Sequence, residues 1–146
     1  MARILSVNIS DKKGEKKHNV GSCRVLYDRG LENDAHAGME LRQISLLAAE
    51  SVQKIRLKGL NVEYGDFAEN LTTEGLELYT LPLGTKMKVG SDVLLEVTQI
   101  GKVCPKPCAI FYAVGDCVMP KEGIFVRVLA EGTISIGDEI TIGDKI

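Results

Sequence analysis

Short apolar runs that alternate with polar residues, with glycines between them, constrain the fold of this sequence more than any other feature. Such strand-like runs occupy Arg3–Ile9, Cys23–Tyr27, Val93–Ile100, Ile124–Ala130 and Glu139–Ile142. In the first run the apolar face is expected to carry Leu5, Val7 and Ile9. The glycines that read as turns between runs are Gly84, Gly90, Gly101, Gly132 and Gly137. Strands and turns at this spacing are typical of an all-β barrel or sandwich.

One segment has helical spacing instead. Leu47–Lys58 carries apolar residues on one helical face, at Ala48, Val52 and Ile55. Ser45 is the predicted N-cap of this helix, and Gly59 the residue that ends it. A second short helical turn is expected over residues 109–114. The predicted fold class is therefore a mainly β barrel with one or two short helices.

Length and charge limit the kind of protein this can be. The chain of 146 residues fits one domain spanning 1–146, and its 18 Lys and Arg against 20 Asp and Glu give a net charge of −2. No overall basic field would attract nucleic acid or a membrane surface. No apolar run approaches about 18 residues, so we expect a cytoplasmic protein with reduced thiols. The lysine-rich stretch Ser10–Asn19 is expected to form a solvated loop or hairpin tip rather than a binding site.

Three of the four cysteines lie within 14 residues, at Cys104, Cys108 and Cys117. Three interpretations remain open for them: inert buried thiols, a structural zinc site, or a reactive or metal-ligating thiolate. Two prolines stiffen the backbone between the first two cysteines, which favours a loop that presents Cys108. The fourth cysteine, Cys23, lies in a strand-like run and fits an inert thiol. No nucleophile elbow, phosphate-binding loop or zinc-protease motif is present.

A second candidate region is the glycine-bounded run from Gly30 to Gly38. In an extended segment Asp34 and His36 would point the same way and converge on one ligand or on each other. The alternative is structural, with Asp34 capping a turn and His36 bonded to the backbone.

A third region surrounds Glu69, Asn70 and Thr72, polar residues set between Phe67 and Leu71. Polar groups beside buried apolar anchors predict a pocket lined with hydrogen-bonding groups. The alternative is a hairpin stabilised by side-chain bonds to its own backbone.

These motifs together resemble the MOSC domain, the family named for the C-terminal domain of molybdenum cofactor sulfurases. The resemblance runs from about Ile4 to Ile142. Its motifs in chain order are Asp34-Ala-His36-Ala-Gly38, Arg42-Gln43, the segment from Gly65 to Thr73, the cysteine loop, and Phe125-x-Arg127-Val with Gly137-Asp138.

The resemblance implies a MOSC-type β-barrel that binds molybdenum cofactor (molybdopterin) or carries sulfur on a cysteine. By position, Cys108 is the residue implied to ligate molybdenum, and Cys104 is a second thiol for persulfide exchange. The residues implied to bind the cofactor are Asp34, His36, Arg42, Glu69, Asn70, Thr72 and Arg127. Thiolates suit a sulfur-rich metal centre, and Arg and amide groups suit a pterin phosphate.

Three departures from the family pattern bear on this expectation. Asn33 stands where Gly is expected before Asp34, and Asn tolerates positive φ better than most residues. Pro105 stands where small members often have His. The chain also lacks a pyridoxal-phosphate desulfurase domain, so no pyridoxal phosphate is expected in it. A cysteine desulfurase or another sulfur donor is the expected partner, and a molybdenum enzyme or cofactor-synthesis protein the expected recipient.

Three functions are therefore compatible with the sequence. The first is a molybdenum cofactor-binding or sulfur-carrier protein that accepts sulfur as a Cys108 persulfide. The second is a small molybdenum-dependent reductase of N-hydroxylated compounds, which needs an external electron donor because no flavin, haem or iron–sulfur motif is present. The third is a non-catalytic molybdopterin-binding domain whose cysteines are structural.

Overall fold

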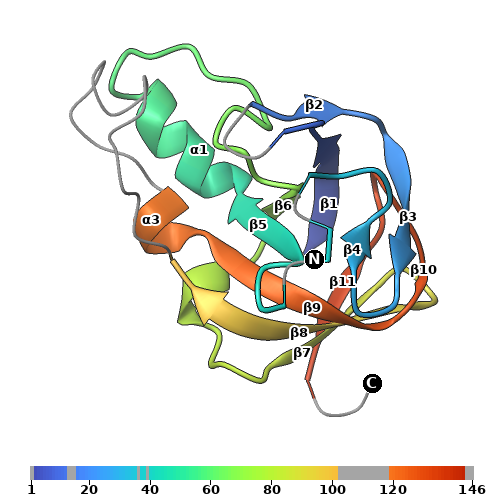
Figure 1. Ribbon diagram of the computed structural model, residues 1–146. Helices are drawn as coiled ribbons and strands as arrows, with labels where there is room; N and C mark the ends of the chain where they lie inside the picture. The colour runs from blue at the N-terminus through green and yellow to red at the C-terminus, as the bar shows by residue number, and fades with distance from the viewer. Residues whose placement is uncertain (1, 13–15, 36, 39, 102–118, 144–146) are drawn as a thin grey trace.

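A computed structural model describes residues 2–12, 16–35, 37–38, 40–101 and 119–143 (Figure 1). The elements in chain order are β1 (Arg3–Ile9), β2 (His18–Asn19), β3 (Ser22–Leu26), β4 (Gly30–Leu31), β5 (Ile44–Ala48), α1 (Ala49–Arg56), β6 (Leu71–Glu74), the 3-10 turn η1 (Leu78–Thr80), β7 (Lys86–Val89), β8 (Val93–Ile100), α3 (Met119–Glu122), β9 (Ile124–Ala130), β10 (Gly132–Ser135) and β11 (Ile140–Ile142). The mainly β fold class is confirmed.

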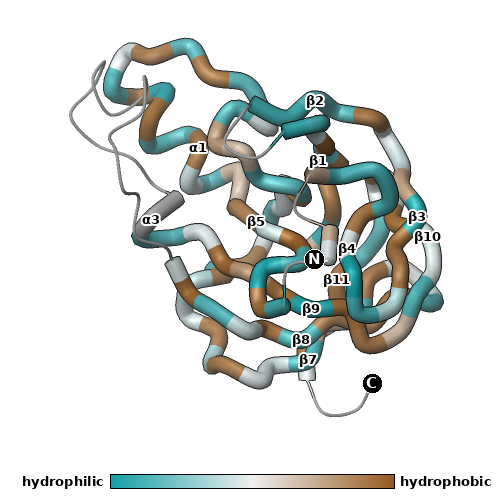
Figure 2. Tube along the Cα trace, in the orientation of Figure 1, coloured by the Kyte–Doolittle hydropathy of each residue, from teal (hydrophilic) through white to brown (hydrophobic). Residues whose placement is uncertain are grey.

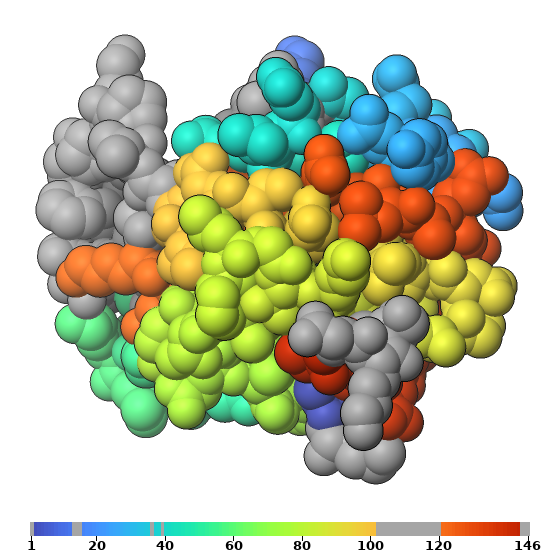
Figure 3. Space-filling model, turned by 90° about the horizontal axis from the view of Figure 1, so that it is seen from below, coloured from blue at the N-terminus to red at the C-terminus, as the bar shows by residue number. Residues whose placement is uncertain are grey.

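The strands form two sheets. The larger has the order β11-β7-β8-β9-β5-β6-β1-β2, and the smaller has the order β10-β3-β4. Only β5 and β6 pair in parallel among the described strands. An antiparallel bridge between Arg3 and Glu139, with a bond from the Ile140 N–H to the Ala2 carbonyl at 2.9 Å, brings the β11 end back to β1. Figure 3 shows this red and blue contact from below.

The main hydrophobic core lies between the strands and takes residues from nearly every one of them. A second, smaller core lies between α1, β5, β9 and the loop that precedes β6. It consists of Leu47, Val52, Ile55, Val62, Phe67 and Phe125. Because β5 separates these two cores, all five of its residues are buried. Along α1 hydrophobic and hydrophilic residues alternate in turn, as an amphipathic helix requires (Figure 2).

The periodic runs predicted five of the eleven described strands, and the other six, β2, β4, β5, β6, β7 and β10, were not predicted. The observed strands β1, β8 and β9 have the predicted bounds, and β3 and β11 are shifted by a residue or less at each end. The predicted apolar face of β1 is confirmed for Val7 and Ile9, which lie in or against the main core, but it is wrong for Leu5, because the pairing with β6 slips between Ile4 and Ser6. This bulge puts Ile4 and Val7 in the core and leaves Leu5 half-buried. Gly132 is also not a turn, since it begins β10.

The predicted helix begins later than its apolar spacing indicates. Residues Leu47 and Ala48 end β5, and α1 begins at Ala49 with no side-chain cap. Ser45 is therefore not an N-cap; it is a buried residue of β5. α1 ends at Arg56, two residues before the predicted Lys58, and the turn that follows it closes at Gly59, which has φ 97° and whose N–H bonds to the Arg56 carbonyl. No described helix is long and apolar enough to cross a membrane.

Candidate functional site

A set of buried amides, hydroxyls and one carboxyl joins β1, β5 and the loop before β6. We call it the buried polar network; it consists of Asn8, Ser45, Glu69, Asn70 and Thr72. The Asn70 side chain accepts a bond from the Ser45 N–H at 2.9 Å and donates to the Asn8 carbonyl at 3.1 Å. Asn8 in turn donates to the Glu69 carbonyl at 3.2 Å. One side chain thus satisfies backbone groups of two strands.

Glu69 is the only carboxyl of this network, and its side chain is completely buried. One oxygen accepts from the Thr72 hydroxyl at 2.9 Å, and the other from the Phe67 N–H at 3.2 Å. Burial raises the pKa of Glu69, while these donors and the N–H groups of Gly65 and Glu69 itself act in the opposite direction. Glu69, Asn70 and Thr72, which the sequence pattern groups as one polar region, lie in one buried network. Asn70 makes the side-chain bonds to backbone that the structural alternative expects, but not in a hairpin, since β6 pairs with β1 and, in parallel, with β5.

Asp34 lies in a separate buried cluster. Its Oδ1 accepts from the Lys17 ammonium at 2.8 Å and from the Ser10 N–H at 3.1 Å. Both charged side chains are 0% exposed. The Asp34 segment is also not extended: the Ala37 N–H bonds to the Asp34 carbonyl at 3.1 Å, and Asn33 has φ 67°. The positive φ expected of Asn33 is confirmed. The Asp34 backbone lies in a turn, the described bonds of its carboxylate run to Lys17 and Ser10, and His36 lies outside the described residues.

The lysine-rich stretch connects β1 and β2, which pair antiparallel, so the expected hairpin is confirmed, but the burial of Lys17 corrects the expectation that the stretch is solvated. The Lys17 backbone N–H bonds to the Gly65 carbonyl at 2.9 Å, and a Cβ at Gly65 would collide with the Lys17 carbonyl. Only glycine allows this approach, because Gly65 also has φ 96°. The lysine-rich stretch is therefore fastened to the loop that carries Glu69.

Arg42 stands just before β5, beside the end of β8 and the start of β9. Segment 102–118 and α3 connect these two strands. The Arg42 guanidinium lies over the Phe125 ring, 5.3 Å from the centroid, and its Nε donates to Gln99 at 3.1 Å. Gln99 and Phe125 face each other across the β8–β9 pair. The aromatic ring and the amide together fix the orientation of the guanidinium plane.

Arg127 takes a different place from the other predicted cofactor-binding residues. It lies on β9, and its Nε donates to Glu96 of β8 at 2.9 Å in an exposed ion pair. Its described contacts join neither the buried polar network nor the Lys17–Asp34 pair.

Three of the predicted site residues fall outside the described part of the chain. They are His36, Cys104 and Cys108, and the helical turn expected at 109–114 lies outside it too. Cys23 is described: it is half-buried, and burial raises the pKa of its thiol, which favours the protonated form. Among the described residues, no three His, Cys, Asp or Glu side chains gather in a way that could hold a metal ion.

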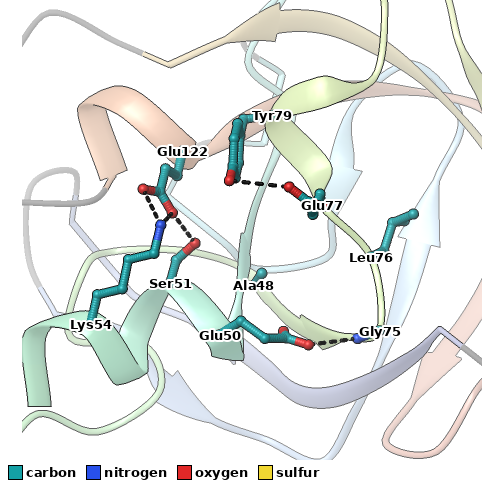
Figure 4. A pocket seen from close by; sticks show the side chains of 9 residues that line it. All are labelled: Ala48, Glu50, Ser51, Lys54, Gly75, Leu76, Glu77, Tyr79 and Glu122. Atoms are coloured by element: carbon teal, nitrogen blue, oxygen red, sulfur yellow. Dashed lines mark hydrogen bonds and ion pairs between the residues drawn. The ribbon is translucent and has the colours of Figure 1, made fainter. Parts of the chain in front are cut away.

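An open hollow of about 450 Å³ lies at the C-terminal end of β5, between α1, α3 and η1 (Figure 4). Its lining residues are Ala48, Glu50, Ser51, Lys54, Gly75, Leu76, Glu77, Tyr79 and Glu122. Glu122 of α3 binds Lys54 and Ser51 of α1, and the Lys54 ammonium lies 5.8 Å from the Tyr79 ring centroid. The sequence analysis missed this hollow. Only the helical spacing of Ser51 and Lys54, which puts both on one face of α1, could have pointed to it.

Comparison with known proteins gives a family and several structural neighbours. The family model described as "MOSC domain" matches residues 33–141. The fold is similar to that of the YUAD protein from Bacillus subtilis, with a TM-score of 0.81 at 20% identity, covering 97% of this chain and 96% of that one. YiiM from Geobacillus stearothermophilus gives a TM-score of 0.73 at 24% identity over 99% of this chain and 76% of its own. YiiM from Escherichia coli gives a TM-score of 0.67 at 19% identity, covering 99% of this chain and 71% of that one. A search of curated protein sequences finds no match.

Proposed function

Because this chain belongs to the MOSC domain family, we propose that it binds molybdenum cofactor or carries sulfur as a persulfide on Cys108. The observation that carries the proposal is the setting of Arg42. Phe125 and Gln99 hold this guanidinium at the strand ends from which the segment with Cys104 and Cys108 leaves the sheet and returns to it.

The setting of Arg42 suits an anionic group such as a pterin phosphate. Among the described residues, its only side-chain hydrogen bond is made through Nε, which leaves the terminal N–H groups as donors. A guanidinium held on an aromatic face loses little freedom when it binds, and two parallel N–H bonds match phosphate oxygens. The residues present therefore fit the phosphate end of the cofactor. The bound cofactor would supply molybdenum chemistry that this chain's own side chains lack.

The buried polar network has a supporting part in this proposal. Glu69, Asn70 and Thr72 are completely buried, so they support the site by holding β1, β5 and β6 in register. Asp34 fixes the Ser10 and Lys17 loop in the same manner. Arg42 and the thiols of Cys104 and Cys108 are the groups that we propose contact the cofactor or sulfur.

For sulfur carriage, the Cys108 thiolate attacks the outer sulfur of a donor persulfide. The donor's S–S bond breaks, a new S–S bond forms on Cys108, and the donor leaves as a thiolate, so there is no net oxidation. A cysteine desulfurase is the class of protein that supplies such a persulfide. In a second exchange of the same kind, a thiolate of the recipient molybdenum enzyme attacks the outer sulfur on Cys108, the S–S bond on Cys108 breaks, and Cys108 leaves as a thiolate. Delivery to the cofactor as sulfide would also need a thiol reductant, which is oxidised to a disulfide.

The sulfur branch is tested by intact mass of the purified protein after incubation with a persulfide donor, with and without reductant. We expect a reductant-labile gain of one sulfur in the wild type and in Cys23→Ser, but not in Cys108→Ser. Cys23→Ser is the matched control because burial raises the pKa of that thiol. A gain that survives in Cys108→Ser contradicts the assignment.

The cofactor branch is tested by reconstitution with molybdenum cofactor and elemental analysis for molybdenum. Arg42→Met keeps the packing over Phe125 but removes the charged donors, so we expect affinity to fall about 10- to 100-fold. Arg24→Met, which changes an exposed arginine on β3, serves as the control. Equal retention by the two variants would remove Arg42 from the site.

A further inference from the structure

The side chain of Gln43 is buried, and both ends of its amide are hydrogen-bonded. Its Oε1 accepts from the Val128 N–H of β9 at 2.9 Å. Its Nε2 donates to Oδ1 of Asp28 at 2.9 Å and to the Glu40 carbonyl at 3.3 Å. The residue is only 1% exposed. An amide that is buried and bonded at both ends is fixed in position and in orientation.

These bonds take the place of a strand pair. β5 and β9 pair antiparallel up to the first residue of β5, and the same register continued would put Arg42 opposite Val128. Instead, the Val128 N–H bonds to the Gln43 side chain, and the Val128 carbonyl accepts from the Asp28 N–H at 3.2 Å. In a strand the N–H and C=O of one residue point the same way, so the edge of Val128 that faces β5 is fully used. We call Gln43, Asp28 and Val128 the Gln43 cluster.

Arg42 therefore stands outside the ladder, and its side chain reaches β8. Its Nε donates to Gln99 of β8, and its guanidinium lies over the ring of Phe125. On the N-terminal side, the Leu41 carbonyl accepts from the Thr98 hydroxyl, also of β8. The Gln43 cluster holds the neighbour on the other side. The backbone on both sides of Arg42 is thus fixed by side chains and not by a continued strand pair.

We propose that Gln43 is a positioning residue for Arg42. By taking the place of Arg42 on β9, the Gln43 cluster ends the β5–β9 ladder before Arg42 and directs its guanidinium over Phe125. The consequence for anion binding rests on the proposed function, whereas the positioning of the guanidinium does not.

Exchanging donor and acceptor within the Gln43–Asp28 bond tests the proposal. Gln43→Glu keeps an acceptor for the Val128 N–H but removes the donor to Asp28, so that two carboxylates face each other. Asp28→Asn alone is the matched control, because its side-chain oxygen still accepts from Gln43. The double variant restores one donor and one acceptor in reversed order and has the net charge of the wild type.

The first measurement is hydrogen exchange of the Arg42 Nε–H in ¹H–¹⁵N NMR spectra, with the resonance assigned by its loss in Arg42→Met. We expect exchange about tenfold faster in Gln43→Glu, because the guanidinium loses its fixed place beside Gln99. Asp28→Asn and the double variant should stay within about twofold of the wild type. Equal exchange in the wild type and Gln43→Glu, or a double variant as fast as Gln43→Glu, would overturn the proposal.

Asp28→Ala keeps the proposal falsifiable if Gln43→Glu does not fold, because Asp28 is exposed. This variant removes the acceptor for Gln43 and also one negative charge. The charge alone would strengthen binding of inorganic phosphate, whereas a displaced Arg42 weakens it. We expect a rise of about two- to fivefold in the Kd for phosphate, together with faster exchange at Arg42 Nε. Tighter phosphate binding with unchanged exchange would contradict the proposal.

Two further readouts separate this proposal from global stability and from the proposed function. Exchange of the backbone N–H of Leu95, a buried residue of β8, reports global unfolding and should not change in Asp28→Ala. A wild type that does not bind phosphate contradicts the assignment of Arg42 to an anion, but the exchange measurement needs no ligand and still tests the positioning. A wild type that binds phosphate, with variants that match it in affinity and in exchange, contradicts the positioning and leaves the proposed function standing.

Discussion

The buried polar network and the open hollow contain the same kinds of side chain but use them differently. Glu69 in the network and Glu122 in the hollow each accept a bond from a neighbouring hydroxyl, that of Thr72 or Ser51. The other described donors to Glu69 are backbone N–H groups, and burial raises its pKa. Glu122 instead pairs with the half-exposed ammonium of Lys54.

The difference shows that the surroundings of a carboxyl, more than its sequence motif, determine its role. A fully buried polar group must have partners, and losing one leaves the full cost of desolvation. A group at a solvated rim can replace a lost partner with water. The network is therefore expected to determine stability, whereas the hollow is expected to affect local geometry.

The largest test of the contrast between buried and solvated polar groups uses the separate Lys17–Asp34 cluster. It compares two lysines that pair with carboxylates at the same distance. Lys17 and Asp34 lie 2.8 Å apart at 0% exposure, and Lys54 and Glu122 also lie 2.8 Å apart but at the edge of the hollow. Lys17→Met leaves a buried carboxylate without its ammonium, and we expect a loss of about 3–5 kcal/mol in unfolding free energy. Lys54→Met should cost no more than about 1 kcal/mol.

Urea denaturation at pH 7, followed by far-UV circular dichroism, measures both free energies. Lys16→Met, at a mostly exposed position next to Lys17, controls for the loss of one positive charge. If Lys17→Met and Lys54→Met lower the free energy of unfolding equally, burial does not distinguish the Lys17–Asp34 pair from the Lys54–Glu122 pair.

The sequence predicted β8, whose alternating burial leaves a period-2 signal, and also β9, whose burial alternates little, but not β7, whose burial alternates. It missed β5, because all five of its residues are buried and its last two, Leu47 and Ala48, fit the helical spacing that continues into α1. It also put Leu5 on the core face of β1 in place of Ile4, since a bulge depends on the partner strand.

The site was predictable only where its residues are close in sequence. Glu69, Asn70 and Thr72 were grouped correctly, but their partners Asn8 and Ser45 lie on other strands. Lys17 resembled its solvated neighbours, and only the tertiary fold buries it beside Asp34. The hollow combines α1, η1 and α3, which no local pattern connects.

The smallest test lies within β6, where two adjacent threonines point to opposite faces. Thr72 bonds to Glu69 in the network, but the buried hydroxyl of Thr73 has no hydrogen-bond partner among the described residues. Thr73→Val replaces that hydroxyl with a methyl of similar volume, so we expect the free energy of unfolding to rise by about 1 kcal/mol. Thr72→Val is the matched control and should lose about 1–3 kcal/mol, because it takes a donor from buried Glu69. Urea denaturation of both variants measures whether the free energy of unfolding rises in Thr73→Val and falls in Thr72→Val. A loss in Thr73→Val comparable to that in Thr72→Val would mean that the Thr73 hydroxyl has a partner in solution, and that the polar network extends to both faces of β6.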